Sequence, residues 1–169
     1  MLAVALMMAP ISASAHIYND RTSWEADVGT YLDVDLPGAD GDVLNAYTRI
    51  ALPYGEYIRF NEELDRFDIC GIECLASDYF SGGNYYARAN FYPDLSSPDR
   101  VAVSAFGFDV APVSDATVRF LLYTPEGEIY QTIDGSAGST FLGWADEDVL
   151  GFSLIAYGDA ALGIEMCNL

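Results

Sequence analysis

Residues 117–133 read TVRFLLYTPEGEIYQTI. Val118, Phe120 and Leu122 alternate with Thr117 and Arg119, and this two-residue period predicts a strand with one buried face and one wetter face. The proline and glycine of the TPEG segment favour a tight turn into a second run of strand-forming residues. The stretch therefore predicts a β-hairpin.

Beyond residue 29 the chain keeps this character, with short runs rich in Val, Ile, Tyr, Phe and Thr between clusters of Gly, Pro, Asp and Asn. Such runs predict antiparallel strands. Further strands are expected at 30–36, 46–52, 56–61, 65–70, 84–91, 101–110, 139–144, 149–157 and 161–168. Gly158-Asp159 predicts a hairpin turn between the last two.

One short helix is expected before the strands. Asn19 or Asp20 is a good N-cap for a helix over 22–28, and Gly29 is a good stop. Many strands with a single short N-terminal helix predict an all-β fold. We expect a two-sheet antiparallel β-sandwich, jelly-roll-like, rather than α/β architecture.

The N-terminal residues 1–15, MLAVALMMAPISASA, have the apolar core and small-residue cleavage site of a secretory signal peptide. This predicts a secreted protein, extracellular or at the cell surface, whose single domain covers 16–169. No later run is long and apolar enough to span a membrane. Cleavage would make His16 the N-terminal residue. A copper site there needs a second histidine, but His16 is the only histidine in the sequence, so no copper site is expected.

The charge balance is strongly acidic. Seven basic residues, all arginine, stand against 26 acids, which gives a net charge of −19. Nucleic acid and anionic membranes are therefore not expected as partners. Aspartate outnumbers glutamate by 17 to 9, which fits a saline environment or divalent-cation binding, and equally a soluble, self-repelling surface.

Three cysteines in an exported chain allow at most one internal disulfide. Cys70 and Cys74 are the predicted pair, because Gly71 between them permits the tight turn that so short a loop requires. Cys167 lies in an apolar C-terminal run and is expected to be buried, with intermolecular pairing as the alternative.

The segment VSAFGFDV at 103–110 resembles a strand of exported bacterial β-sandwich proteins of the PEP-CTERM-associated type. The order of segments is similar too: RTSW at 21–24, YLDVD at 31–35, FLGW at 141–144, LGFSL at 150–154 and GIE at 163–165. The resemblance implies a secreted β-sandwich. The sorting tail of those proteins is absent here, so sortase-like processing is not expected.

Jelly-roll modules resembling this chain hold calcium where the first and last strands run close together. The resemblance implies metal ligands at Asp33, Asp35, Glu165 and Asn168, with calcium as the cofactor. Asp33 and Asp35 share one face of the predicted strand, and carboxylate oxygens suit calcium. The spacing of an EF-hand loop is not met. A solvated acidic edge strand is the alternative.

Tyrosine is abundant, at 12 residues, and several gather in the middle of the chain. Flat rings that carry a hydroxyl are good surfaces for sugar stacking, and asparagine and arginine add hydrogen bonds. A ligand-binding site is predicted at Tyr79, Asn84, Tyr85, Tyr86 and Arg88. Packing of the tyrosines on strand faces, without a ligand, is the alternative.

No catalytic site is predicted. The only histidine lies at the expected N-terminus, and the acids are too numerous for any one pair to be chosen. We expect a secreted, non-catalytic module for extracellular matrix, adhesion or polysaccharide binding, with a polysaccharide or a cell-surface component as partner. Two alternatives stay open: a glycan-active hydrolase or lyase on a jelly roll, and a self-assembling structural surface protein.

Overall fold

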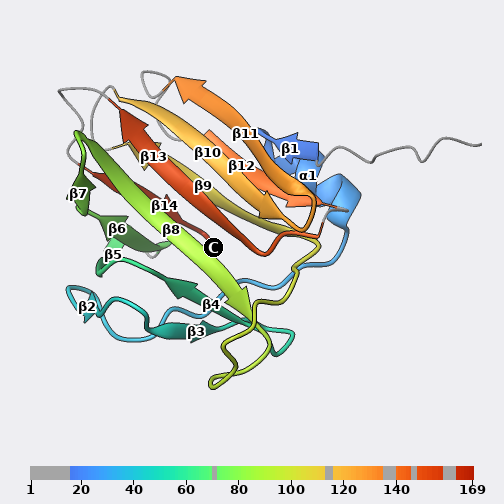
Figure 1. The fold of residues 1–169 in the computed structure, drawn as a ribbon, viewed down its shortest axis with the longest axis horizontal. Helices are drawn as coiled ribbons and strands as arrows, with labels where there is room; N and C mark the ends of the chain where they lie inside the picture. The colour runs from blue at the N-terminus through green and yellow to red at the C-terminus, as the bar shows by residue number, and fades with distance from the viewer. Residues whose placement is uncertain (1–15, 70–71, 113–115, 135–139, 146–147, 158–162) are drawn as a thin grey trace, which may run out of the picture.

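The computed structural model describes residues 16–69, 72–112, 116–134, 140–145, 148–157 and 163–169, so the predicted signal peptide lies outside the described residues. Two antiparallel sheets face one another (Figure 1). Sheet A contains, in order across the sheet, β1 (His16–Tyr18), β12 (Thr140–Ala145), β9 (Phe106–Pro112), β14 (Ile164–Cys167), β6 (Ile72–Ser77), β5 (Leu64–Ile69) and β2 (Val43–Leu44).

Sheet B contains, in order, β11 (Gly127–Asp134), β10 (Thr117–Thr124), β13 (Gly151–Tyr157), β8 (Asn84–Tyr92), β4 (Tyr57–Phe60) and β3 (Arg49–Ala51), and β7 (Phe80–Ser81) pairs with β8 beside them. In Figure 1, β8, β13, β10 and β11 run side by side. The predicted all-β antiparallel sandwich with one short N-terminal helix is confirmed.

The hairpin at 117–133 forms as its alternation predicts. Thr124 pairs with Gly127 across the turn, and β10 pairs with β11 along its whole length. Val118, Phe120 and Leu122 are buried, whereas Thr117 and Arg119 are exposed. The two-residue period therefore defines the inner and outer faces of sheet B.

Aromatic rings from both sheets fill the core. Trp144 and Phe108 of sheet A meet Phe120, Phe152 and Phe91 of sheet B, and all five are fully buried. The rings of Phe108 and Phe152 stack with centroids 5.1 Å apart. Each such side chain contributes roughly 1.5–3 kcal/mol through burial alone, so this cluster holds the two sheets together.

Helix α1 (Arg21–Val28) packs on the outer side of sheet A. The Asp20 carboxylate accepts hydrogen bonds from the backbone and the hydroxyl of Ser23, and Gly29 ends the helix at a φ of 77°. Trp24 donates from Nε1 to the carbonyl of Trp144 at 2.9 Å. The predicted helix and its caps are thus confirmed, and Trp24 anchors the helix.

A pair of glycines makes room for Trp24. Gly107 on β9 lies opposite Gly143 on β12. A Cβ at Gly107 would lie 2.5 Å from the Phe141 ring, and one at Gly143 would lie 3.0 Å from the Trp24 ring. The AFGFD and FLGW segments therefore owe their glycines to this aromatic contact.

Some predicted elements are wrong. The segment 30–36 is not a strand, although the Val34 backbone N–H donates to the carbonyl of Leu169 at 2.8 Å. Strands β13 and β14 belong to different sheets, so Gly158-Asp159 does not join a hairpin, and its own structure lies outside the described residues. Strand β6 was not predicted, because its first residues were assigned to a disulfide loop.

The disulfide joins Cys74 to Cys167, so the predicted Cys70–Cys74 pair is wrong. Cys74 and Cys167 lie directly opposite one another in the register of β6 and β14, with Cα atoms 4.2 Å apart. A strand pair thus brings together two residues 93 positions apart, which local spacing cannot show. Cys70 lies outside the described residues.

Within the described part of the chain, no helix is long and apolar enough to cross a membrane.

Candidate functional site

The outer face of β8 carries three of the five predicted sugar-binding residues. Asn84, Tyr86 and Arg88 alternate with residues that face the core. Tyr85 instead packs against the hydrophobic core and against the Phe80 ring, with centroids 5.0 Å apart. Tyr85 therefore does not share the outer surface of Tyr86, because neighbours in a strand point to opposite faces.

Tyr79 joins this outer group. Its ring lies 6.4 Å from that of Tyr86, and the Arg88 guanidinium lies 5.8 Å from the Tyr79 ring centroid and 5.4 Å from that of Tyr86. Arg88 is fixed by the buried Glu62 carboxylate, which accepts from Nε at 2.5 Å and from the Arg88 backbone N–H at 2.8 Å. Burial lowers the pKa of Arg88, but the Glu62 carboxylate more than offsets this, so the pKa is raised.

The same face continues across β13 and β10. Tyr157 lies opposite Asn84 on β13, and Arg119 on β10 lies in the same row as Tyr86, with Ile155 between them. The Arg119 guanidinium lies 5.3 Å from the Tyr157 ring and 5.3 Å from the Tyr130 ring. These side chains form one surface, because directly paired residues of a sheet project to the same side.

Two further arginines extend the surface across β4 and β3. Arg59 lies opposite Asn90 of β8, and Arg49 lies opposite Arg59. Both guanidinium groups lie over the buried ring of Tyr92, at 4.2 Å for Arg49 and 4.5 Å for Arg59. Arg49 also donates to the carbonyls of Asp94 and Ser97.

We name this surface the tyrosine–arginine face. It comprises Tyr47, Arg49, Arg59, Tyr79, Asn84, Tyr86, Arg88, Tyr92, Arg119, Tyr123, Tyr130 and Tyr157. Tyr123 is tied to Ser153 of β13 by a 2.6 Å hydrogen bond between their hydroxyl oxygens. Four of the seven arginines of the chain lie here, in a molecule with a net charge of −19.

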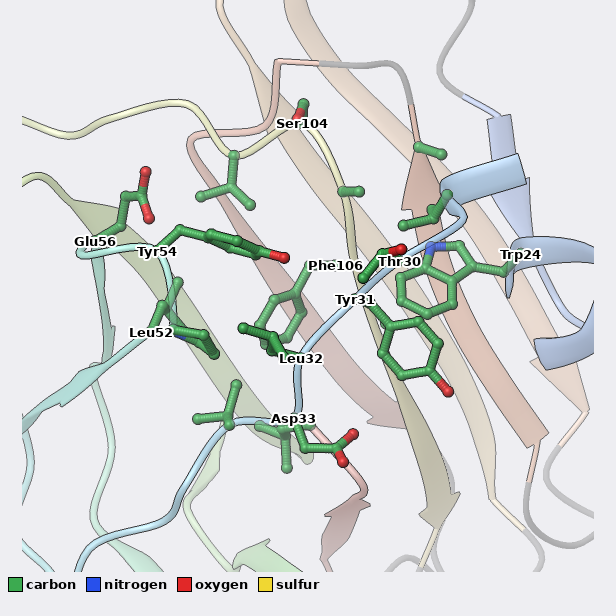
Figure 2. A pocket seen from close by; sticks show the side chains of 18 of the residues that line it. Trp24, Thr30, Tyr31, Leu32, Asp33, Leu52, Tyr54, Glu56, Ser104 and Phe106 are labelled. Atoms are coloured by element: carbon green, nitrogen blue, oxygen red, sulfur yellow. The ribbon is translucent and has the colours of Figure 1, made fainter. Parts of the chain in front are cut away.

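A second candidate is a groove of about 470 Å³ beside helix α1 (Figure 2). In the view of Figure 2, Leu32 lies between the rings of Tyr54 and Tyr31. Tyr54 is 70% exposed and Leu32 is 55% exposed, so both are accessible to a ligand. Its titratable lining is mainly acidic: Arg21, Asp27, Asp33 and Glu56. We call it the Tyr31–Tyr54 groove.

The predicted calcium ligands are brought together only in part. Asp33 and Asn168 both line the Tyr31–Tyr54 groove and a neighbouring hollow, whereas Asp35 and Glu165 line neither. The Asn168 amide donates to Asp109 at 2.6 Å, and Arg21 pairs with the same carboxylate at 3.2 Å. Among the described residues, no group of three or more His, Cys, Asp or Glu side chains is placed to hold a metal. The calcium site stays a prediction.

Comparisons with known proteins give little guidance. No protein-family model and no curated protein matches the chain. Among solved structures, it is similar to a mutant of CBM29-2, from work on ligand recognition by family 29 carbohydrate-binding modules, with a TM-score of 0.39 and 14% identity over 75% of this chain and 87% of that one. At this level of similarity the likeness carries no argument about function, and the resemblance to PEP-CTERM-associated proteins stays a prediction.

Sequence reasoning missed most of the tyrosine–arginine face. Arg49, Arg59, Arg119 and Tyr157 come from separate strands and meet only through the strand order of sheet B. The alternation in 117–123 already placed Arg119 on the wet side of its strand. Nothing local indicated that this side would adjoin Tyr86.

Proposed function

We propose that this protein is a secreted, non-catalytic β-sandwich module that binds polysaccharide on the tyrosine–arginine face. The observation that carries the proposal is the alignment of Tyr86, Tyr157 and Arg119 on one outer sheet surface, where the core does not need them. A ring with an apolar body and a hydroxyl can stack on a sugar and also hydrogen-bond to it.

The face is also held in place, which favours binding. The ion pair with Glu62 fixes the guanidinium of Arg88, and the hydrogen bond to Ser153 fixes the ring of Tyr123. Side chains that are already ordered lose less conformational entropy when a ligand binds. The Cys74–Cys167 disulfide is compatible with an oxidising, extracytoplasmic location.

The test is a titration of the purified protein against a panel of neutral and acidic polysaccharides, with calcium and with chelator. Tyr86→Ala is expected to weaken binding by tenfold or more, since truncation of an aromatic residue that dominates a binding surface costs about 2 kcal/mol or more. Tyr54→Ala is the matched control, because Tyr54 is an exposed tyrosine of the groove. Circular dichroism and thermal melting show that both variants fold.

Two results would contradict the proposal. One is the absence of binding across the whole panel. The other is binding that Tyr54→Ala abolishes and Tyr86→Ala leaves intact, which would move the site to the Tyr31–Tyr54 groove. Release of new reducing ends or unsaturated sugars during the titration would instead support a glycan-active hydrolase or lyase.

A further inference from the structure

The arginines of the tyrosine–arginine face follow a diagonal across sheet B. Arg49 and Arg59 are paired with one another on β3 and β4, Arg88 lies one row of outward-facing residues further along on β8, and Arg119 lies one row beyond that on β10. From β3 to β10 the line crosses four strand spacings, about 19 Å at the usual separation of paired strands. Such a line matches an extended chain more than a compact ligand.

We infer that the ligand of this face is an acidic polysaccharide, a chain of sugars that bear carboxylate groups. This inference rests on the proposed function and names its substrate class. Guanidinium groups bind carboxylates through two parallel hydrogen bonds, while neighbouring tyrosine rings contact the apolar faces of the sugars. The diagonal of arginines and the tyrosines beside it supply both kinds of contact.

The strongest support is that three of these four arginines form no ion pair with a carboxylate of the described residues. Among the described residues, no carboxylate forms an ion pair with Arg49, Arg59 or Arg119, and only Arg88 has one, with Glu62. The buried Nε of Arg59 meets no hydrogen-bond acceptor in the described part of the chain. Three arginines on one face without an ion pair to a described residue are unexpected in a chain with 26 acids.

The pairing of Arg49 with Arg59 points the same way. Like charges placed directly opposite one another across two strands are destabilising. Here both guanidinium groups lie over one ring, Tyr92, which offsets part of that cost through cation–π attraction. A local arrangement that disfavours folding is typical of a functional surface.

The net charge of −19 does not prevent this binding. At physiological salt the Debye length is about 8 Å, so the acids elsewhere on the surface are largely screened from a ligand that contacts the arginines. On the face itself, Glu62 is engaged with Arg88, and register places Glu128 on the edge strand β11. Nucleic acid is a disfavoured ligand. A duplex carries one phosphate charge about every 1.7 Å along its axis, which is a much higher charge density than four arginines spread over about 19 Å.

The experiment compares polygalacturonate with the same polymer after full methyl esterification, by calorimetry of the purified protein at physiological salt. Binding to the charged polymer and loss of tenfold or more on esterification are expected. Arg119→Gln is expected to weaken binding to the charged polymer by about tenfold, as for other hydrogen bonds to charged groups. Arg100→Gln removes the same charge from an exposed arginine that is not among the residues of the tyrosine–arginine face, and it is expected to change little.

The outcomes separate this inference from the proposed function. Equal binding to both polymers, or binding to neutral polysaccharides alone, overturns the acidic ligand but keeps polysaccharide binding. The absence of binding to every polysaccharide overturns both the acidic ligand and the proposed function. Equal weakening by Arg119→Gln and Arg100→Gln, or tighter binding to a single-stranded oligonucleotide than to polygalacturonate, overturns the acidic ligand as well.

Discussion

The tyrosine–arginine face and the Tyr31–Tyr54 groove both present tyrosine rings to solvent, but their charges are opposite. The face carries four arginines, three of them without an acidic partner among the described residues. The groove carries Asp27, Asp33 and Glu56, and its one arginine, Arg21, is paired with Asp109. Tyrosine content alone therefore does not separate the two surfaces. Their charge does, because the face is basic and the groove is acidic.

The two regions also rest on different supports. The face lies on the long strands β8, β13 and β10, whose residues pair continuously. The groove is built mostly from helix α1, loops and the C-terminal residues, with Phe106, Gly107 and Ala145 contributed by β9 and β12. The Val34–Leu169 hydrogen bond joins a loop to the C-terminal residues. Regular pairing predicts a rigid face, whereas the groove depends on a few long-range contacts.

The largest expected effect comes from removing the disulfide, which supports the groove side of the molecule. Because the bridge closes a loop of 93 residues, Cys74→Ser with Cys167→Ser is expected to cost about 4 kcal/mol of unfolding free energy. Hydrogen exchange is expected to rise first in β14 and around Val34, while β8 and β13 keep their protection. An equal rise of hydrogen exchange in both sheets would contradict the expectation that the groove depends on the disulfide more than the face does. Cys70→Ser serves as the control.

An intermediate effect is expected from Arg59→Gln, which tests whether the face is arranged for binding rather than for folding. The substitution removes a like-charge pair with Arg49 and also a cation–π contact with Tyr92. These two effects, each below about 1 kcal/mol, oppose one another. Chemical denaturation should therefore show almost unchanged stability, while the affinity for polygalacturonate falls. A large loss of stability with unchanged affinity would contradict this expectation.

The smallest effects are expected from two exposed aspartates, one at the N-terminus of α1 and one in the loop that follows β8. Hydrogen bonds from Ser23 lower the pKa of Asp20, which caps α1 beside the groove. Hydrogen bonds from the Ser96 backbone and hydroxyl lower the pKa of Asp94, in the loop that receives Arg49. Both contributions are present at neutral pH and are lost as the pH falls through the folded-state pKa, below the ordinary value of 3.8.

Substitution separates these two caps. Asp20→Ala is expected to lower the melting temperature slightly at pH 7 without changing glycan affinity, and Asp94→Ala to weaken glycan affinity slightly. Both differences from the wild type should shrink as the pH falls below the ordinary carboxyl pKa of 3.8 and through the lowered folded-state pKa, because the wild-type carboxylates then become protonated. A difference that persists unchanged over that pH range would show that the carboxylate charge is not involved.

Local patterns predicted the fold well where a strand has one wet face. The alternation in 117–123 and the TPEG turn predict the β10–β11 hairpin, and Asp20 and Gly29 predict the ends of α1. Strand β6 is not predicted, because the spacing of Cys70 and Cys74 suggests a disulfide loop there. The disulfide partner of Cys74 is Cys167, which lies on the distant strand β14.

The candidate site was predictable only along one strand. Tyr86, Arg88 and Asn84 belong together because they alternate on β8, but the same period shows that Tyr85 cannot join them. Arg119 and Arg59 reach the face from strands whose order in the sheet depends on the whole fold. Strand order depends on long-range packing, so the line of arginines becomes visible only in three dimensions.

Strand β14, the last in the chain, lies in the interior of sheet A between β9 and β6. Until it docks, the strands β1, β12 and β9 have no hydrogen-bonded connection within that sheet to β6, β5 and β2. A chain that lacks residues 164–167 therefore cannot complete this sheet, and such non-local closure is slow. Completion of sheet A therefore requires residues 164–167, and the Cys74–Cys167 disulfide links this closing strand covalently to β6.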